Sequence, residues 1–412
     1  MKASYAQIPM KIVRRVRNRL ARRLRQPRMC VARLDRLLIG QENGIPAERW
    51  ARMVGNLLRP SAPLSKSPHV KLLEEYLSKG DTLFEPEHIS HTDYFRNALQ
   101  SVDIVGRYFD AKSEDQIVQV ARRFVDTFRG IDQTGCPRQY GQSSPDDPIR
   151  VRPIAHSDHY QIIDGHHRLA IAYVRGEQQA LVRPEGEPVL TPLQSLLLDV
   201  LWLNGRRELY QPVDAPELKA SWVLVRKCSD RLTQMLKFLK DQGLDSATSP
   251  TYLDIASSYG WFVSEMSKLG YDAYGVERDP IASSIGPVVY NLPFNRIFRS
   301  DCVRFFRQNQ RKFDVTSCFS LLHHFAMGNG SVPPEEFIRL VDRITGKVLF
   351  LDTGQNHESW YKSLLPEWDA DFIDDWIRKH TSFRHIHRLG VDEDAVPPFQ
   401  ENFGRMLFAC TR

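Results

Sequence analysis

The sequence lacks the long apolar runs, paired cysteines and apolar leader that mark membrane and secreted proteins. No stretch of the 412 residues approaches the ~20 consecutive apolar residues that a membrane-spanning helix needs. The six cysteines are scattered without a CxxC pair, which argues against a disulfide framework and against a zinc knuckle. The first residues do not contain the apolar core of a secretory signal. We therefore expect a protein of the reducing cytoplasm.

The whole chain carries a formal net charge of only +6, but its first acidic residue is Asp35. Residues 11–28 contain nine Lys or Arg. As a helix, this stretch would place Ile12 and Leu20 on one side and most of the arginines on the others. We predict a basic amphipathic segment over residues 1–40. It could lie on an anionic membrane at the inner leaflet, bind another polyanion, or be a solvated helix packed on its own protein.

A chain of this length exceeds what one hydrophobic core usually organises, so we expect two or three domains. Residues 41–135 show apolar residues at helical spacing, as in "HVKLLEEYLSKG" and "EDQIVQVARRFVDTFRG", and both stretches close on a glycine, Gly80 and Gly130. Residues 136–200 combine turn formers with the strand-like runs "IRVRPIA", "YQIID" and "QQALVRP". A helical region followed by a small α+β domain is predicted.

A turn after "YQIID" carries five residues suited to an anion: Asp164, Gly165, His166, His167 and Arg168. Glycine permits a tight strand-to-helix turn, and the free N–H groups at the start of a helix form an anion site that the arginine can complete. A metal site is less favoured, because adjacent histidines on a turn rarely converge on one ion. The structural alternative is a turn in which Asp164 caps the helix.

The stretch "DGHHRLA" resembles the ParB/sulfiredoxin-like superfamily, and especially its free-serine-kinase branch. The resemblance implies that the glycine, both histidines and the arginine of this turn contact the phosphates of ATP or another nucleotide with Mg²⁺. Asp164 would serve as a base if the domain transfers phosphoryl groups. A DNA-clamp role is disfavoured, because residues 190–240 show no helix-turn-helix with a basic recognition face.

Residues 201–247 are interpreted as a helical bridge, and a second domain is predicted over residues 248–412. Its opening stretch, "TYLDIASSYGWFVSEMSKLGYDAYGVERDP", has the pattern strand, tight loop, helix, loop, strand of a doubly wound sheet. Asp254 ends the first strand and Glu277 the second. A carboxylate at the second position suits a ribose, because it accepts hydrogen bonds from both vicinal hydroxyls. The loop has no GxGxxG, so a nucleoside-like cofactor without a pyrophosphate is predicted.

Four motifs in order resemble class I S-adenosylmethionine (SAM) methyltransferases over about residues 250–412: the loop after Asp254, then Glu277, then Asp301 in "FRSDCVRFF", then "FDVTSCFSLLHHF". The resemblance implies an α/β fold with a doubly wound, seven-stranded, Rossmann-like sheet, and SAM as cofactor. It also implies roles for the motif residues. Asp254 and the loop would hold the methionine part, Glu277 the ribose and Asp301 the adenine amine, with Phe319 and Ser320 bordering the pocket.

Ala256 and Ser258 stand where the family motif D-x-G-x-G-x-G has glycines, which leaves Gly260 as the loop's glycine. A degenerate domain without cofactor is therefore an alternative. His323 and His324 follow the fourth strand, where family members place groups that face the substrate. A neutral imidazole there could take a proton from a hydroxyl during methyl transfer. The alternative is that one of the two caps a helix or packs internally.

We predict a methyltransferase that acts on an oxygen or nitrogen of a small molecule or glycan, with an accessory nucleotide-binding domain. The paired architecture resembles proteins of bacterial surface-polysaccharide assembly, which implies a sugar or sugar phosphate as acceptor. One alternative is a nucleotide-gated regulatory protein. Another is a nucleic-acid methyltransferase, disfavoured because "SLLHHF" stands where an N/D-P-P-Y/F motif is expected. The aromatic residues of "HESWYKSLLPEW" either stack on sugars or form a small core of their own.

Overall fold

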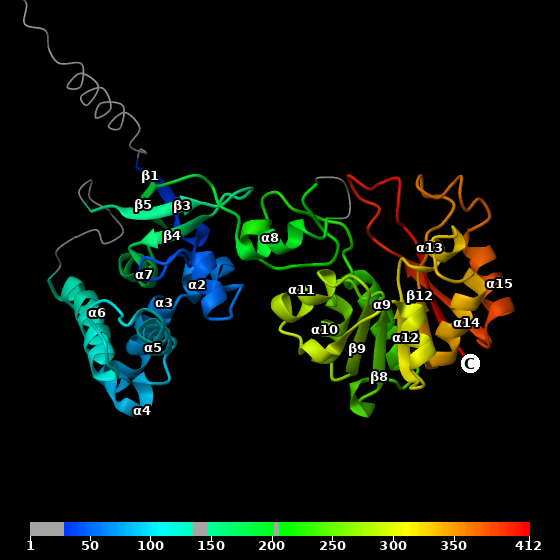
Figure 1. Cartoon of the computed structure of the whole chain (residues 1–412), viewed down its shortest axis with the longest axis horizontal. Helices are drawn as coiled ribbons and strands as arrows, with labels where there is room; N and C mark the ends of the chain where they lie inside the picture. The colour runs from blue at the N-terminus through cyan, green and yellow to red at the C-terminus, as the bar shows by residue number, and fades with distance from the viewer. Residues whose placement is uncertain (1–28, 135–146, 202–205) are drawn as a thin grey trace, which may run out of the picture. The chain divides into compact units, whose positions relative to one another are not determined.

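The computed structural model describes residues 29–134, 147–201 and 206–412 (Figure 1). The predicted basic helix at 11–28 lies outside the described residues. The chain divides into two compact units, which we call the first unit (Met1–Leu193 with Ala215–Ala220) and the second unit (Gln194–Asp214 with Ser221–Arg412). No helix in the described ranges is long and apolar enough to cross a bilayer.

The first unit contains a five-stranded sheet in the order β1-β5-β3-β4-β2. Its strands are β1 (Cys30–Arg33), β2 (Leu37–Leu38), β3 (Ile149–Pro153), β4 (Tyr160–Asp164) and β5 (Gln179–Pro184). Its helices are α2 (Ala47–Met53), α3 (Pro68–Lys79), α4 (Pro86–Ile89), α5 (Asp93–Val105), α6 (Glu114–Thr134) and α7 (His166–Val174), and α8 (Pro192–Leu198) contains the boundary to the second unit. Short 3₁₀ turns occupy Leu34–Arg36, Arg59–Ser61, Leu64–Lys66, Gly80–Phe84 and Pro216–Leu218.

Local sequence explains where several of these helices begin and end. The Ser67 hydroxyl accepts a hydrogen bond from the Val70 amide and so caps α3, which ends at Gly80 with a φ of 61°. Thr92 caps α5 in the same way. Gly130, predicted to end a helix, lies inside α6 instead, which continues to Thr134. A glycine within a helix costs only about 1 kcal/mol, which the apolar face of a long helix readily offsets.

One hydrophobic core joins the helices and the sheet of the first unit. It includes Leu72 of α3, Phe124 of α6, Ile162 of β4 and Ala32 of β1. The predicted boundaries at residues 40 and 135 therefore do not separate compact units. The strands β1 and β2 are too short to show a periodic pattern, and their pairing with distant strands is set by the fold rather than by neighbouring residues.

The second unit is built on a seven-stranded sheet in the order β10-β9-β8-β11-β12-β14-β13. The strands are β8 (Thr251–Ile255), β9 (Asp272–Glu277), β10 (Ile297–Arg299), β11 (Phe313–Cys318), β12 (Thr345–Leu351), β13 (His385–Val391) and β14 (Met406–Thr411). The strand β14 runs antiparallel to both its neighbours, whereas the pairs from β10 to β12 are parallel. The predicted seven-stranded α/β sheet is confirmed.

Helices cover both faces of this sheet, as Figure 1 shows. They are α9 (Ser229–Asp241), α10 (Trp261–Lys268), α11 (Ala282–Val289), α12 (Cys302–Gln308), α13 (Leu322–Ala326), α14 (Pro334–Ile344) and α15 (Ala370–His380), with 3₁₀ turns at Ser246–Thr248 and Phe294–Arg296. The predicted bridge, residues 201–247, contains α9 and also a two-stranded pair, β6 (Glu208–Leu209) with β7 (Val223–Leu224).

The chain leaves β8 toward β9 and β10 on one side and later returns to β11 on the other side. The strand order therefore reverses between β8 and β11. In open α/β sheets, ligands bind beyond the carboxyl ends of the strands at such a reversal. This edge of the sheet is where the predicted cofactor residues are expected to meet.

Candidate functional site

A cavity of about 540 Å³ lies at the carboxyl ends of β8, β9, β10 and β11. Five of the seven predicted cofactor residues line it: Ala256, Ser258, Glu277, Asp301 and Phe319. The cavity has the size expected for a small-molecule site, about 300–1,000 Å³. The fold thus brings together residues from four separate loops of the sequence.

The loop after β8 turns sharply into α10 through left-handed backbone conformations. Ala256 has a φ of 59°, Ser258 of 51° and Gly260 of 83°. The positive φ favours glycine at position 260, and a Cβ there would also lie 2.6 Å from the Cδ1 atom of Ile297, which would have to shift. Ala256 and Ser258 hold a conformation that L-residues rarely adopt, and such strain concentrates at functional sites. Gly260 itself supports the turn rather than lining the cavity.

Glu277, at the end of β9, is held by two backbone donors. Its Oε2 atom accepts a hydrogen bond from the Ser258 amide at 2.8 Å, and its Oε1 atom accepts one from the Asp279 amide at 2.8 Å. Burial raises the pKa of this carboxyl. Each carboxylate oxygen has more than one acceptor position, so both keep capacity for ligand hydroxyls. Ribose binding by Glu277 stays a prediction.

Asp254 lies at a smaller recess, of about 20 Å³, rather than at the main cavity. The recess shares Ala256 and Phe319 with that cavity, so the two adjoin. The Asp254 side chain is buried and accepts a hydrogen bond from the Ser317 hydroxyl at 2.6 Å. Burial raises its pKa to about 7, because a buried carboxylate is poorly solvated.

Asp301 combines a structural and a cavity-facing position. Its side chain caps α12 by accepting a hydrogen bond from the Arg304 amide at 3.0 Å. Ser320, which also borders the cavity, has a φ of 53° and donates its backbone N–H to Asp352 Oδ1 at 2.7 Å. The buried carboxylate of Asp352 therefore fixes the loop that follows β11.

The two histidines predicted as catalytic have different surroundings. His324 lines the cavity and is exposed. His323 is buried, its Nδ1 atom accepts the Gly354 amide at 3.0 Å, and its Nε2 atom lies 3.0 Å from the Tyr361 hydroxyl. The prediction that both histidines face the substrate is therefore corrected, because both ring nitrogens of His323 have internal partners. Burial lowers the pKa of both imidazoles.

Several cavity residues were not predicted from the sequence: Tyr210, Arg278, Ser300, Leu321, Phe325 and Asn329. Arg278 follows Glu277 directly, so its position beyond the second strand was a usable signal. Tyr210 lies in the predicted bridge and reaches the cavity only through the tertiary fold. The aromatic stretch after β12 forms core rather than a sugar platform, since Tyr361 and Trp368 are buried and join the second unit's core.

The predicted phosphate-binding turn of the first unit forms as a strand-to-helix turn. Gly165 has a φ of 100°, and a Cβ there would lie 3.0 Å from Ile149 Cγ1. Asp164 makes no capping bond and instead pairs with Arg150 at 3.5 Å. Arg168 lines a cavity of about 300 Å³, but its Nη1 atom donates to the carbonyl of Asp147 at 2.8 Å. An anion would have to compete with that contact.

The two histidines of this turn pack among other rings. The His167 ring lies 4.2 Å from that of Phe124 and 4.7 Å from that of His69, and its Nε2 atom lies 3.0 Å from the Tyr94 hydroxyl. The His166 ring stacks on His69 at 5.4 Å. Burial lowers the pKa of His166 and of His167 to about 3. His167 nevertheless lines the cavity of about 300 Å³ together with Arg168, so phosphate binding by this turn stays a prediction.

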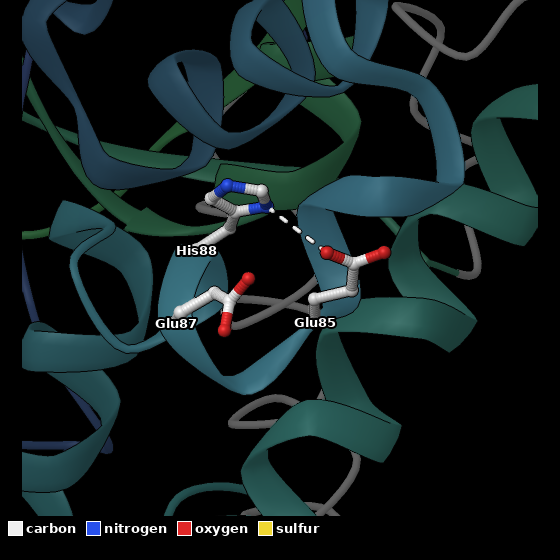
Figure 2. A group of neighbouring side chains, drawn as sticks. All are labelled: Glu85, Glu87 and His88. Carbon is white, nitrogen blue, oxygen red and sulfur yellow. Dashed lines mark ion pairs between the residues drawn. The ribbon is translucent and has the colours of Figure 1, made fainter.

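A group of possible metal ligands lies on the first unit, where Glu85, Glu87 and His88 bring their ligand atoms within 4.8 Å of one another (Figure 2). His88 Nδ1 lies 3.7 Å from the Glu85 carboxylate and 2.8 Å from the Thr82 carbonyl oxygen. The two carboxylates are exposed. Exposed acidic groups lie this close in many proteins without an ion, so we assign no metal to this group.

Residues 224–391 match the family model described as a methyltransferase domain. This match supports a SAM-dependent methyltransferase. The methyltransferase match begins at Leu224, the last residue of β7, rather than at the predicted boundary near 248, and it includes every strand from β8 to β13. No curated protein matches the chain significantly.

Solved structures with partial similarity include the bifunctional kinase-methyltransferase WbdD, at 16% identity and a TM-score of 0.40, covering 53% of this chain and 46% of that one. This chain therefore spans less than half the length of WbdD. The methyltransferase domain of a bacterial Hen1 matches at 14% identity and a TM-score of 0.33, covering 45% of this chain and 98% of that one. Magnesium protoporphyrin IX methyltransferase from Synechocystis PCC 6803 with bound SAM matches at 16% identity and a TM-score of 0.33, covering 44% of this chain and 79% of that one.

Proposed function

We propose that the second unit binds SAM in the 540 Å³ cavity and transfers its methyl group to an oxygen of a sugar or sugar phosphate. The observation that carries the proposal is the cavity itself. It lies where the strand order reverses, inside the region that matches a methyltransferase domain, and it is lined by Glu277 and Asp301 at the ends of consecutive strands.

The residues present suit this cofactor. Glu277 is fixed by two backbone amides and can accept the ribose hydroxyls. Asp301 borders the same cavity, where a carboxylate can accept from the adenine amine. Ala256 and Ser258 reproduce the left-handed turn of a glycine-rich loop, so the glycine replacements do not block the turn. When bound, SAM supplies a methyl group on a sulfonium, which is already electrophilic.

The protein's own contribution is alignment and removal of one proton. In-line attack on a methyl group requires the acceptor oxygen opposite the sulfur, so most of the rate comes from holding the two partners in place. His324 lines the cavity with a pKa below the usual value for histidine, so its imidazole is neutral at pH 7. It can accept the hydroxyl proton as the oxygen–carbon bond forms.

The imidazole of His324 bears on the class of the methyl acceptor. A basic imidazole at the cavity favours a hydroxyl, whose proton must leave during transfer, over an already deprotonated nucleophile. The resemblance to proteins of surface-polysaccharide assembly favours a sugar hydroxyl. Peripheral contact with an anionic membrane through residues 11–28 would place the enzyme near a lipid-linked glycan.

Methyl transfer from labelled SAM to a panel of sugars, sugar phosphates and RNA tests the proposal. The His324→Asn variant should transfer about 10²-fold more slowly, within the usual range for loss of a general base, and should bind SAM as tightly as the unchanged protein. The exposed His91 on the first unit provides the matched control, His91→Asn. If the labelled methyl group appears in RNA but in no sugar, the proposed sugar acceptor is wrong. If His324→Asn turns over as fast as the unchanged protein, His324 is not the general base.

A further inference from the structure

The turn between β8 and α10, residues 256–260, is held in part by a side chain from a distant segment of the sequence. We call these residues the cofactor turn. The Nε2 atom of Gln211 donates to the Ser257 carbonyl at 3.2 Å, and its Oε1 atom accepts from the Trp261 amide at 3.1 Å. Gln211 is 5% exposed and precedes these partners by 46 and 50 residues. It therefore lies outside the residues that match the methyltransferase family.

The local sequence leaves the start of α10 without a cap of its own. The N-cap residue is Gly260, which has no side chain to accept a hydrogen bond from the first free amides of the helix. Gln211 accepts one of them, the Trp261 amide. Its other contact is the Ser257 carbonyl, which also accepts from the Gly260 amide at 2.8 Å. A side-chain amide suits this place because it offers a donor and an acceptor together.

The cofactor turn needs such support because its backbone is strained. Ala256 and Ser258 have left-handed conformations, which persist only where the surroundings fix them. The Ser258 amide donates to Glu277 Oε2 at 2.8 Å, and the two contact points of Gln211 lie before and after Ser258 in the chain. The position of this amide, and with it the orientation of the Glu277 carboxylate, therefore depends on Gln211.

Gln211 is itself fixed by its neighbours in the chain. The Tyr210 amide donates to the Tyr259 hydroxyl at 3.4 Å, and the Pro212 carbonyl accepts from the Tyr290 hydroxyl at 2.7 Å. The backbone is thus tied to the second unit on both sides of Gln211. Its side chain is oriented before any ligand arrives, which reduces the ordering that binding requires.

We infer that Gln211 is a positioning residue for the cofactor, because it fixes the cofactor turn so that Glu277 is oriented toward the ribose hydroxyls. The inference rests on the proposed function and adds a residue that precedes the matched domain. Gln211 does not line the 540 Å³ cavity, so it acts through the turn and not by touching SAM.

Calorimetric titration of SAM into the full-length Gln211→Met variant tests the effect on binding. Methionine has a similar length but lacks the amide, so both contacts with the turn are lost. We expect SAM to bind about five- to tenfold more weakly, in line with the net effect of one or two neutral hydrogen bonds. The fitted stoichiometry reports the folded fraction separately from the affinity.

Gln234→Met is the matched control. Gln234, in α9, also makes a tertiary contact, from its Nε2 atom to the Val391 carbonyl at 3.4 Å, and it lines neither the main cavity nor the adjoining recess. This variant should bind SAM as the unchanged protein does.

Hydrogen–deuterium exchange of the SAM-free protein separates a role at the turn from general support of the fold. In Gln211→Met, peptides that contain Ser258 and Trp261 should exchange at least about fivefold faster, whereas β12 should exchange as in the unchanged protein. Once an acceptor is found, the variant should raise KM for SAM and leave kcat within about twofold, because Gln211 contacts neither reacting partner.

Three results would overturn the inference while the cofactor site stands. They are SAM binding by Gln211→Met at the affinity of the unchanged protein, unaltered exchange in the turn, and faster exchange over all strands alike. If the unchanged protein does not bind SAM, the proposed function fails and this inference fails with it.

Discussion

The residues Ala256 and Ser258 have left-handed backbone conformations, which glycine adopts without strain. An L-residue pays about 1–2 kcal/mol for a left-handed conformation, whereas glycine populates it freely. The loop therefore stores strain beside the cavity. The family motif D-x-G-x-G-x-G has two glycines that this loop lacks, so the sequence alone left open whether the loop forms the same tight turn. The backbone conformations of Ala256 and Ser258 show that the turn forms.

We predict that Ala256→Gly stabilises the second unit by about 1 kcal/mol, opposite in sign to the usual effect of glycine, because relief of the left-handed strain exceeds the entropy that glycine loses on folding. Urea denaturation of the full chain measures it. Ala326→Gly, at the end of α13, is the control and should destabilise. If both substitutions destabilise the protein to the same extent, Ala256 is not strained in its left-handed conformation.

Residue roles were predictable from the sequence where chain position alone determines them. Glu277 and Asp301 follow strands, so their place at the carboxyl edge follows from the order of elements. His323 and His324 are adjacent, yet one is buried against Tyr361 and the other faces the cavity. Only His323 is buried because Gly354 and Tyr361, in the loop after β12, contact its ring nitrogens. That loop is about 30 residues away in the sequence, so the pattern around the histidines does not predict the contact.

At the scale of elements, buried ion pairs hold the loops that border the cavity. Arg405, just before β14, pairs with Glu358 and also donates to the Ser320 hydroxyl at 2.9 Å. Both partners are nearly inaccessible to solvent. Removing one partner of a buried pair typically costs about 3–5 kcal/mol, because the other charge remains buried. The loops after β11 and β12 are therefore fixed to the terminal strand, and the cavity wall is largely preformed.

The aromatic cluster between α3, α5, α6 and α7 gives the first unit a pH dependence. His167 has its pKa lowered by burial to about 3, against about 6.5 in an unfolded chain. The contribution of the neutral His167 imidazole to the stability of the first unit is therefore fully present above pH 6.5, and it is lost as the pH falls from 6.5 toward 3. His69 and His166 act in the same direction, and Arg59 disfavours their charged forms further.

We predict that the thermal transition of the first unit falls between pH 7 and pH 5, and that it falls less in His167→Gln than in the unchanged chain. Differential scanning calorimetry of the full-length protein at both pH values measures this. His91→Gln, which removes an exposed histidine, should leave the pH dependence as it is. An equal decrease in His167→Gln and in the unchanged chain would show that His167 ionises normally.

Elements with strong periodicity were predicted well, and short or non-local ones were not. The strands β8, β9, β11 and β12 follow from apolar runs bounded by turns. The two-residue strands β2, β6 and β7 show no pattern, because their pairing depends on distant partners. The N-terminal strand β1 has the same limitation, so the sheet of the first unit could not be predicted in full.

At the scale of the whole molecule, the chain has two units with cores of their own. The boundary could not be placed from composition, because residues 215–220 return to the first unit after 194–214 have joined the second. Such a crossing leaves no local signal. The second unit carries the cofactor cavity and the methyltransferase match, whereas nucleotide binding at Arg168 of the first unit stays a prediction.

Calorimetric titration of SAM into the full-length protein tests the central claim most directly. The account predicts one site per chain with roughly micromolar affinity, the lower end of common KM values. Glu277→Ala should weaken binding at least about tenfold, since a charged acceptor for the ribose hydroxyls is lost. The exposed surface variant Glu336→Ala should bind as the unchanged protein does. Absence of binding, or equal binding in both variants, would contradict a SAM site in this cavity.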